Sequence, residues 1–318
     1  MVISADYRYD TKMDIYRRKK TKKNALPDYR FIVMGDSRGK DEGVNEEIFR
    51  ALLNEIMGLY PEPDYIMFSG DLVSGSRKSK ELKAQLKKFK EIFTDYFPIE
   101  ILLPTVGNHE VGSNPEDDTR EKIFAKVYSE FEADEFLKGY NRTAYYVDVG
   151  DVRLIALNSY HPGESNQITG RQLEWFRRVV REPKKHKLVF LHAPAYPVGQ
   201  HIGSSLDAYP EERDRFWDII DKNHVGLVFA GHEHNYSRRR IDKSFSTEAY
   251  QFQGEVDQIV AGGAGAPLRD TFADEQGVIV PPIAAYHYVI VDVYGEDLYV
   301  KAVSVDGDII DEFIIKHH

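Results

Sequence analysis

Two histidines stand one residue apart in "VFAGHEHNYSRRR", from Val228 to Arg240, directly behind an apolar run and a glycine. If the segment is an extended strand, alternate side chains point the same way, and His232 and His234 then share a face. Two imidazoles on one face make a natural pair of metal ligands. The alternative is a polar loop whose histidines form local hydrogen bonds, and the rest of the chain has to decide between the two.

Four other apolar runs also end in residues that bind metals well. The runs "RFIVMGD", "DYIMFSGD", "IEILLPTVGNHE" and "KLVFLHA" end at Asp36, at Asp71, at Asn108 with His109, and at His192. Each residue alone has a plain alternative: a helix cap, a turn residue or a hydrogen-bonded buried histidine. Together with the histidine pair, however, five strand ends deliver carboxylate, amide and imidazole groups to the edge at which α/β sheets bind ligands.

These residues resemble the ordered motifs of the calcineurin-like metallophosphoesterase superfamily. The motifs stand here as "GDSRG" (35–39), "SGDLV" (69–73), "GNHE" (107–110), "LHAP" (191–194) and "GHEH" (231–234). Within the superfamily, "NRTAYYVDVGDVRLIALNS", "HAPAY" and "GHEHNYSR" are most similar to the purple acid phosphatase branch. The resemblance implies a hydrolase of phosphoric esters.

The resemblance also implies two metal ions and their ligands. One ion is held by Asp36, Asp71 and His234, and the second by Asp71, Asn108, His192 and His232, so that Asp71 bridges. Two cations about 3.5–4 Å apart that share a carboxylate and a hydroxide suit in-line attack on phosphorus, because they stabilise both the nucleophile and the phosphoryl oxygens. Imidazole and carboxylate ligands suit Mn, Fe or Zn and do not choose among them.

By the same resemblance, His109 is a catalytic residue that faces the substrate rather than a ligand. A protonated imidazole there neutralises the phosphate or gives a proton to the leaving oxygen, and the ordinary pKa of histidine lies close to neutral pH. Glu110, the next residue, is either a partner that supports the ligands or an ordinary exposed carboxylate.

Two positions depart from the motifs. Where most of the superfamily has a histidine ligand, this chain has Arg38, which is always cationic and cannot bind a metal. The first metal site is then weak or completed by water. The planar fork of Arg38 suits a catalytic clamp on the phosphate, and the alternative is a structural ion pair. Where the purple branch has a tyrosine ligand, this chain has Ser74, so a tyrosinate-ligated purple iron is not expected.

Several residues near the motifs are candidates for holding the organic part of the ester. We predict substrate contacts for His201 and Tyr196 in addition to Arg38, with Tyr160, His161 and Tyr236 as further candidates. For each of them the alternative is a surface or packing role.

Two further segments have simpler interpretations. The arginine run 238–240 is a contact for an anionic substrate or, as we favour, part of a solvated strand. The segment "AGGAGAPL" (261–268) lacks the Lys-Ser/Thr of a nucleotide-binding loop, so we expect it to pack tightly beneath the metal centre.

The elements that position these residues are short apolar strands with amphipathic helices between them. Segment 79–97 places apolar residues at three- and four-residue steps and predicts a helix. Segment 169–182 predicts another, with Thr169 and Gln172 as a capping box. Segment 286–315 alternates apolar and polar residues and predicts a three-stranded meander. Segment 244–286 is too irregular to assign.

This order of elements predicts an α/β protein, a layered α/β/β/α sandwich with the metal site at the carboxyl ends of its strands. No repeat or linker divides the chain. We therefore expect one domain over 27–318 and a partly flexible N-terminal arm over 1–26. The basic cluster in that arm is a solvated tail or a contact for an anionic surface.

Composition excludes several classes of function. The chain has 318 residues, 42% of them hydrophobic, and no cysteine, which rules out disulfides, zinc–thiolate sites and thiol nucleophiles. Its net charge of −10 makes nucleic acid an improbable partner. Without a signal-like or membrane-spanning apolar run, we expect a soluble, cytoplasmic protein, unless a leader has been removed. The oligomeric state is not fixed by the sequence.

We therefore expect a dinuclear metal-dependent hydrolase, most of all a phosphomonoesterase acting on a small phosphorylated substrate. One alternative is a phosphodiesterase of cyclic nucleotides or nucleotide conjugates. Another is a metal-binding scaffold weakened by Arg38, against which the intact His109 argues.

Overall fold

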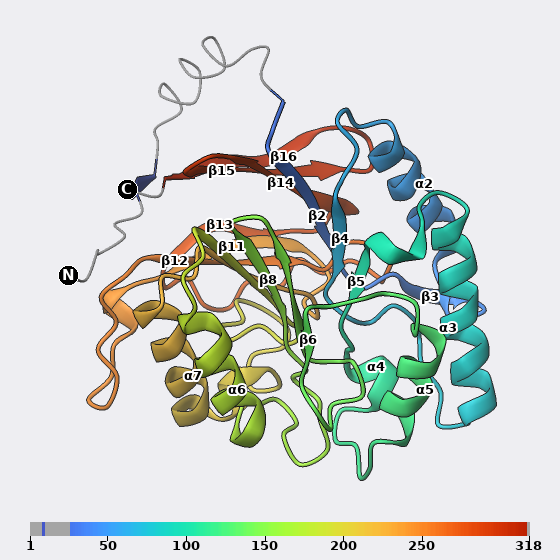
Figure 1. Ribbon diagram of the computed structural model, residues 1–318, viewed down its shortest axis with the longest axis horizontal. Coiled ribbons are helices and arrows are strands. Elements are labelled where there is room, and N and C mark those ends of the chain that lie inside the picture. Colours follow the sequence, from blue (N-terminus) through green and yellow to red (C-terminus); the bar gives the residue numbers. More distant parts are fainter. Residues whose placement is uncertain (1–7, 10–25, 317–318) are drawn as a thin grey trace.

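The computed structural model describes residues 8–9 and 26–316. Two β-sheets pack face to face, with helices α2 and α3 beside one sheet and α6 and α7 beside the other (Figure 1). This layering confirms the predicted α/β/β/α sandwich. Among the described residues, no helix is both long and apolar enough to cross a membrane.

The first sheet joins three parallel strands at one edge to an antiparallel meander. In spatial order its strands are β1 (Arg8–Tyr9), β16 (Ile309–Lys316), β15 (Asp297–Ser304), β14 (His287–Tyr294), β2 (Tyr29–Met34), β4 (Tyr65–Phe68) and β5 (Leu102–Pro104). Strands β2, β4 and β5 run parallel. Strands β14, β15 and β16 confirm the predicted meander.

The second sheet has antiparallel strands on both sides of a parallel centre. In spatial order its strands are β13 (Val278–Ile283), β11 (Tyr236–Ile241), β12 (Val256–Ala261), β10 (Leu227–Ala230), β9 (His186–Phe190), β8 (Val152–Ala156), β7 (Tyr145–Val149) and β6 (Glu135–Phe136). Strands β8, β9, β10 and β12 run parallel. Strands β12 and β13 lie in the segment that the sequence left unassigned.

The remaining elements connect the strands. The helices are α2 (Glu46–Met57), α3 (Ser79–Thr94), α4 (Asn108–Val111), α5 (Thr119–Val127), α6 (Gly170–Arg181) and α7 (Pro210–Lys222). Short 3₁₀ turns are η1 (Ile99–Ile101), η2 (Leu206–Ala208) and η3 (Lys243–Phe245), and β3 (Arg38–Asp41) is a short strand outside both sheets. Helix α3 confirms the helix predicted over 79–97.

Aromatic side chains fasten the helices to the first sheet. Phe89 of α3 stacks on Phe49 of α2 at 4.8 Å between ring centroids and meets Phe68 of β4 edge-on at 5.0 Å. All three rings are fully buried. Each such ring contributes a few kcal/mol by burial, so this cluster holds the end of β4 rigidly beneath the residues that follow it.

The predicted capping box at the start of α6 is wrong. Thr169 is the N-cap residue, but its side chain makes no capping hydrogen bond. Gln172 is buried and turns inward instead, where it accepts from the backbone N–H of Asn158 at 2.8 Å and donates to its carbonyl at 2.9 Å. A long-range partner therefore replaces the local one.

The arginine run 238–240 is also not a solvated strand. Arg238 and Arg239 lie buried in β11. Arg238 donates to Asp257 at 2.9 Å and to Asp311 at 2.7 Å, and Arg239 donates to Asp274 at 2.7 Å. Buried guanidinium groups need such carboxylate partners, and these arginines serve the packing of β11 rather than an anionic substrate.

Most of the predicted N-terminal arm, including its basic cluster, lies outside the described residues. Within it, β1 pairs antiparallel with the edge strand β16. The division into an arm over 1–26 and a domain over 27–318 stays a prediction.

Candidate metal centre

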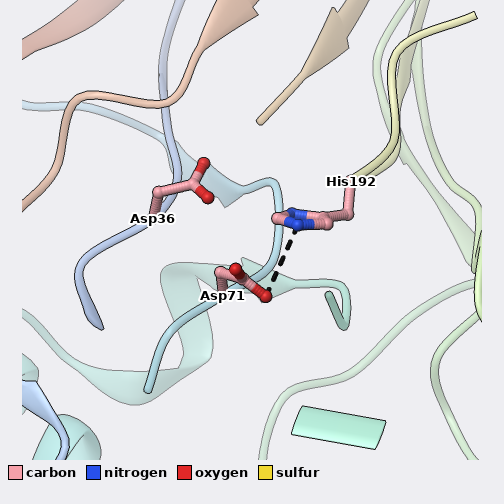
Figure 2. A group of neighbouring side chains, drawn as sticks. All are labelled: Asp36, Asp71 and His192. Atoms are coloured by element: carbon pink, nitrogen blue, oxygen red, sulfur yellow. Dashed lines mark ion pairs between the residues drawn. The ribbon is translucent and has the colours of Figure 1, made fainter. Parts of the chain in front are cut away.

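Five strand ends from the two sheets meet at one point. Strands β2, β4 and β5 lead into Asp36, Asp71 and Asn108, whereas β9 and β10 lead into His192 and His232. Ligand atoms of Asp36, Asp71 and His192 lie within 4.8 Å of one another, and all three residues are buried. Figure 2 shows these side chains pointing toward one another from separate segments. The structure thus brings together residues that are up to 156 positions apart in the chain.

Four of the predicted ligands have backbone conformations that non-glycine residues rarely adopt. The angle φ is 65° at Asp36, 51° at Asp71, 73° at His232 and 51° at His234. Each such residue costs of order 1–3 kcal/mol and persists only where its surroundings hold it, typically at functional sites. The segment 231–234 is therefore a turn, and the extended strand considered for the histidine pair is wrong.

The two carboxylate oxygens of Asp36 have different roles, one in the fold and one in the site. Its Oδ2 accepts the backbone N–H of His232 at 2.9 Å and so ties the two sheets together. Its Oδ1 is buried without a hydrogen bond and lies 3.5 Å from Nε2 of His234. Only glycine fits at position 231, because a Cβ there would overlap Oδ2 of Asp36.

Two of the histidines have one ring nitrogen fixed by the backbone. Nδ1 of His192 lies 2.8 Å from the carbonyl oxygen of Ser69, and Nδ1 of His234 lies 3.0 Å from that of Pro267. A carbonyl oxygen only accepts, so each Nδ1 carries the proton and each Nε2 presents a lone pair to the site.

The lone pair of His192 faces three other predicted ligands. Its Nε2 lies 3.1 Å from Nδ1 of His232, 3.2 Å from Oδ1 of Asn108 and 3.4 Å from Oδ1 of Asp71. The dashed line in Figure 2 marks the contact with Asp71. Nδ1 of His232 can donate to this nitrogen, but the oxygens of Asn108 and Asp71 face its lone pair with no proton between them.

The charge states of these groups favour a metal. Burial lowers the pKa of His192 and of His234 to about 3 and that of His232 well below its ordinary value, so all three are neutral at neutral pH. Burial, and next the charge of Asp71, raise the pKa of Asp36 well above its ordinary value. Unpaired lone pairs and carboxylates that repel one another are energetically unfavourable in a site without water. A divalent cation removes both penalties, so this set of donor groups fits a metal.

Glu110 supports the ligands from behind. Its buried carboxylate accepts the backbone N–H groups of Gly107 at 2.8 Å, Asp71 at 2.9 Å and Val73 at 3.0 Å. Burial, and next the charge of Asp71, raise the pKa of Glu110 to about 8, and the three N–H groups counter part of that rise. Of the two interpretations of Glu110, the structure therefore excludes the exposed carboxylate.

His109 sits at the rim of the same cluster. Its Nδ1 lies 2.8 Å from the carbonyl oxygen of Ser74, which fixes the ring, and its Nε2 lies 3.8 Å from Oδ2 of Asp71. The side chain is 30% exposed, in contrast to the buried ligands. A substrate bound at the cluster is therefore within reach of Nε2.

Arg38 also lies at the cluster. Its Nε is 3.5 Å from Oδ2 of Asp71, and its Nη2 is 3.3 Å from Nε2 of His234. The guanidinium is 20% exposed, and its Nε makes no hydrogen bond. Arg38 thus balances the carboxylates and keeps N–H groups available on the open side of the site.

His201 lies at the centre, and Glu233, a residue that the sequence analysis missed, holds its loop in place. Its ring centroid lies 3.8 Å from that of His232. Glu233, fully buried, accepts the backbone N–H groups of Gln200 and His201 at 3.1 Å each and fixes this loop. The sequence did contain a signal for this role, since Glu233 stands between His232 and His234. A charged residue inside a buried turn needs hydrogen-bond partners.

The structure does not bring the Tyr196 hydroxyl to the site. Tyr196 packs against Trp217 and Phe245, and its hydroxyl donates to Asp214 at 2.9 Å. Its ring belongs to the core beneath α7, since the hydroxyl has a buried partner there.

The other three candidates also have packing contacts. The ring of Tyr160 lies 5.9 Å from that of His192 and lines the buried side of the centre. The hydroxyl of Tyr236 donates to Asp311, and Nδ1 of His161 lies 2.8 Å from Oε1 of Glu121.

The glycine-rich segment after β12 packs beneath the centre, as expected. A Cβ at Gly262 would lie 2.9 Å from Oδ2 of Asp36 and 3.0 Å from the backbone nitrogen of His234. Ala264 donates to the carbonyl of Gly35, and Ala266 to that of Asp36. These contacts hold the loop that carries Asp36.

Known proteins resemble the chain in sequence. The family model described as calcineurin-like phosphoesterase matches residues 29–236. The probable glycerophosphodiester phosphodiesterase GpdQ of Arcobacter nitrofigilis is 26% identical over 259 residues, which are 79% of this chain and 84% of that protein. The serine/threonine-protein phosphatase CPPED1 of Danio rerio is 24% identical over 263 residues, 77% of this chain and 73% of that protein.

Purple acid phosphatases resemble parts of the chain as well. Purple acid phosphatase 21 of Arabidopsis thaliana is 30% identical over 142 residues, 42% of this chain and 30% of that protein. The structure of purple acid phosphatase PPD1 from yellow lupin superposes with a TM-score of 0.68 at 16% identity, over 90% of this chain and 53% of that one. The fold is thus shared with a protein about twice as long.

Proposed function

Because the chain belongs to the calcineurin-like phosphoesterase family, in its purple acid phosphatase-like branch, we propose that it is a phosphomonoesterase that works with two metal ions. Family membership makes it a metal-dependent hydrolase of phosphoric esters. The observation that carries the proposal is the separation of the ligand atoms into two groups. Oδ1 of Asp36 faces Nε2 of His234, and the second group surrounds Nε2 of His192.

The two groups suit two ions that share Asp71. One ion would be held by Asp36, Asp71 and His234, and the other by Asp71, Asn108, His192 and His232. When bound, the ions supply Lewis-acid chemistry that makes water nucleophilic near neutral pH and neutralises charge on the phosphoryl oxygens. Mn, Fe and Zn all suit these ligands.

Arg38 binds and orients the phosphoryl group. It lies beside Asp71 and has N–H groups that no carboxylate of the described residues holds at bidentate hydrogen-bond distance. A planar guanidinium pairs with two phosphoryl oxygens at once, which fixes the ester for in-line displacement.

His109 handles the proton of the leaving group. The carbonyl of Ser74 fixes Nδ1, so a proton on Nε2 points toward the site and passes to the leaving oxygen as the P–O bond breaks. His201 lies over His232 and lines the place of the organic part of the ester.

The preference for monoesters rests on charge. A monoester carries more negative charge than a diester at neutral pH, and Arg38 adds a permanent cation where most relatives of the superfamily have a neutral histidine. A diesterase is the second candidate, because one relative that covers most of the chain is named as a probable glycerophosphodiester phosphodiesterase.

Hydrolysis of para-nitrophenyl phosphate and of its bis ester, each with Mn, Fe or Zn, tests the proposal. We expect the larger kcat/KM for the monoester and a dependence on added metal with two ions per chain. A larger value for the bis ester would show a diesterase. No turnover of either ester with any of these metals, in protein that binds them, would show a metal-binding scaffold.

A further inference from the structure

A cavity of about 650 Å³ opens directly beside His109 and has no part in the proposed reaction. Its wall includes Val111 and Gly112, at the end of α4, the helix that carries His109. The opposite wall includes Arg77, from the loop in which the Ser74 carbonyl fixes the His109 ring. Helices α3, α4 and α5 lie together on this side of the molecule (Figure 1). The cavity is therefore lined by the helix that carries His109 and by the segment that follows Ser74.

Two arginines line this cavity without forming an ion pair with any carboxylate of the described residues. In the described part of the chain, neither Arg77 nor Arg120 makes an ion pair or a side-chain hydrogen bond. By contrast, Arg153 and Arg238 pair with Asp148 and Asp257 at 2.8–2.9 Å. In a chain with a net charge of −10, two unpaired guanidinium groups that face one cavity favour an anionic occupant.

Gly112 lets Arg120 reach the cavity. A Cβ at Gly112 would lie 2.8 Å from Nη1 of Arg120, so the guanidinium packs directly against this residue. The angle φ of 99° at Gly112 also requires glycine. Arg120 is half-buried, which restricts its motion, whereas Arg77 is exposed.

The acidic residues nearby do not form ion pairs with these arginines. Glu116 and Asp117 also line the cavity, but Oδ1 of Asp117 accepts the backbone N–H of Thr119 at 2.9 Å. Glu81, at the start of α3, is occupied by Lys78 and Ser76. The carboxylates of Glu116 and Asp117 both keep their charge, but neither forms an ion pair with Arg77 or Arg120, so the two guanidinium groups stay available to an added negative group.

We propose that this cavity is a second anion site, which holds a carboxylate or phosphate on the organic part of an ester whose scissile phosphoryl group lies at the metal centre. The proposal rests on the proposed phosphoesterase function and specifies its substrate class: phosphoesters with a second anionic group. Arg77 and Arg120 pair with that group and determine specificity. They take no part in bond breaking.

Phenyl phosphates with a carboxylate on tethers of one to four carbons test the proposal. The matched references are the methyl ester of each carboxylate, which has similar size without the charge, and unsubstituted phenyl phosphate. A matching phosphonate series distinguishes a carboxylate site from a phosphate site. We expect the acid to have a higher kcat/KM than its methyl ester at one tether length.

Arg77→Ala and Arg120→Ala should each lower the preference for the acid about tenfold, the lower end for a hydrogen bond to a charged group, through KM and not kcat. Hydrolysis of phenyl phosphate should not change. Arg181→Ala, which removes an exposed arginine from α6, is the control and should change neither rate. Because Arg120 is half-buried, Arg77→Glu at an exposed position is a second variant, and it should abolish the preference.

Failure of this site and failure of the proposed function give different results. If phenyl phosphate is hydrolysed but Arg77→Ala, Arg120→Ala and Arg77→Glu all keep the wild-type preference, the second anion site is refuted and the phosphoesterase stands. If phenyl phosphate is not hydrolysed, calorimetric titration of the acid into metal-free protein decides. A dissociation constant that rises about tenfold in these variants, but not in Arg181→Ala, supports the site, and equal constants overturn it.

Discussion

Replacing Glu110 by Gln should weaken metal binding although Glu110 is not a predicted ligand. In the wild type, one carboxylate oxygen accepts from Gly107 and Asp71, and the other accepts from Val73. A glutamine can keep its oxygen toward the first two donors, but its amide NH₂ then faces the N–H of Val73 at about the present 3.0 Å, donor against donor.

The size of the effect follows from the loss of this one hydrogen bond. At a pH above the pKa of Glu110, losing one hydrogen bond to this charged acceptor costs about 1.5–3 kcal/mol, which corresponds to roughly 10- to 150-fold in an equilibrium constant. The N–H group that loses its acceptor belongs to Val73, two residues after the predicted ligand Asp71, so part of the loss appears as metal affinity. We expect the metal dissociation constant to rise about 10- to 100-fold, as is usual for residues that orient ligands.

Calorimetric titration with Mn²⁺ or Zn²⁺ measures the affinity, and urea unfolding in the presence of a chelator measures the stability of the metal-free fold. Glu248→Gln is the control, because Glu248 is exposed and lies in the loop between η3 and β12. A loss confined to the unfolding free energy, with the metal affinity within twofold of wild type, would show that Glu110 serves the fold alone. No change in either quantity would refute the positioning role.

Three further changes probe other parts of the molecule. His109→Ala should leave the metal content intact, as measured by elemental analysis, and lower kcat by roughly 10²–10⁴. The loss should be smaller for a leaving group that needs no proton. Equal losses for good and poor leaving groups would limit His109 to substrate binding. Arg38→Ala should raise KM and reduce monoester hydrolysis more than diester hydrolysis. Arg38→His should instead increase the affinity for the metal at the Asp36 and His234 site. Proportional losses for both esters would make Arg38 a structural residue. Burial lowers the pKa of His287 to about 4, so the unfolded chain binds its proton first and stability should fall by up to about 3 kcal/mol as the pH drops from about 6.5 toward 4. Urea unfolding of His287→Gln should show a shallower pH dependence than wild type, and identical slopes would contradict this assignment.

The sequence predicted the residues that lie at strand ends because that information is local. An apolar run followed by glycine and a ligand marks Asp36, Asp71 and Asn108 within a few positions, and parallel strands then bring these ends to one edge. The helix at 79–94 and the final meander were predicted for the same reason, since periodicity is read over a short window.

The errors concern residues whose partners are far away in the chain. Arg238 looks like a surface residue until Asp257 and Asp311 are placed beside it, 19 and 73 positions later. Gln172 fits a local cap until Asn158 offers both of its backbone groups. The turn at 231–234 escaped notice because positive φ at histidine is uncommon and has no sequence signature of its own.

The origin of the ligands in both sheets has a mechanical consequence. Asp36, Asp71 and Asn108 belong to one layer of the sandwich, and His192, His232 and His234 to the other. An ion that binds across this seam acts as a cross-link between layers, and its binding energy adds to the free energy that keeps them closed. A chelator therefore loosens β4 and β10 together, although the two strands belong to different sheets. Resistance to heat should therefore rise with occupancy of the centre.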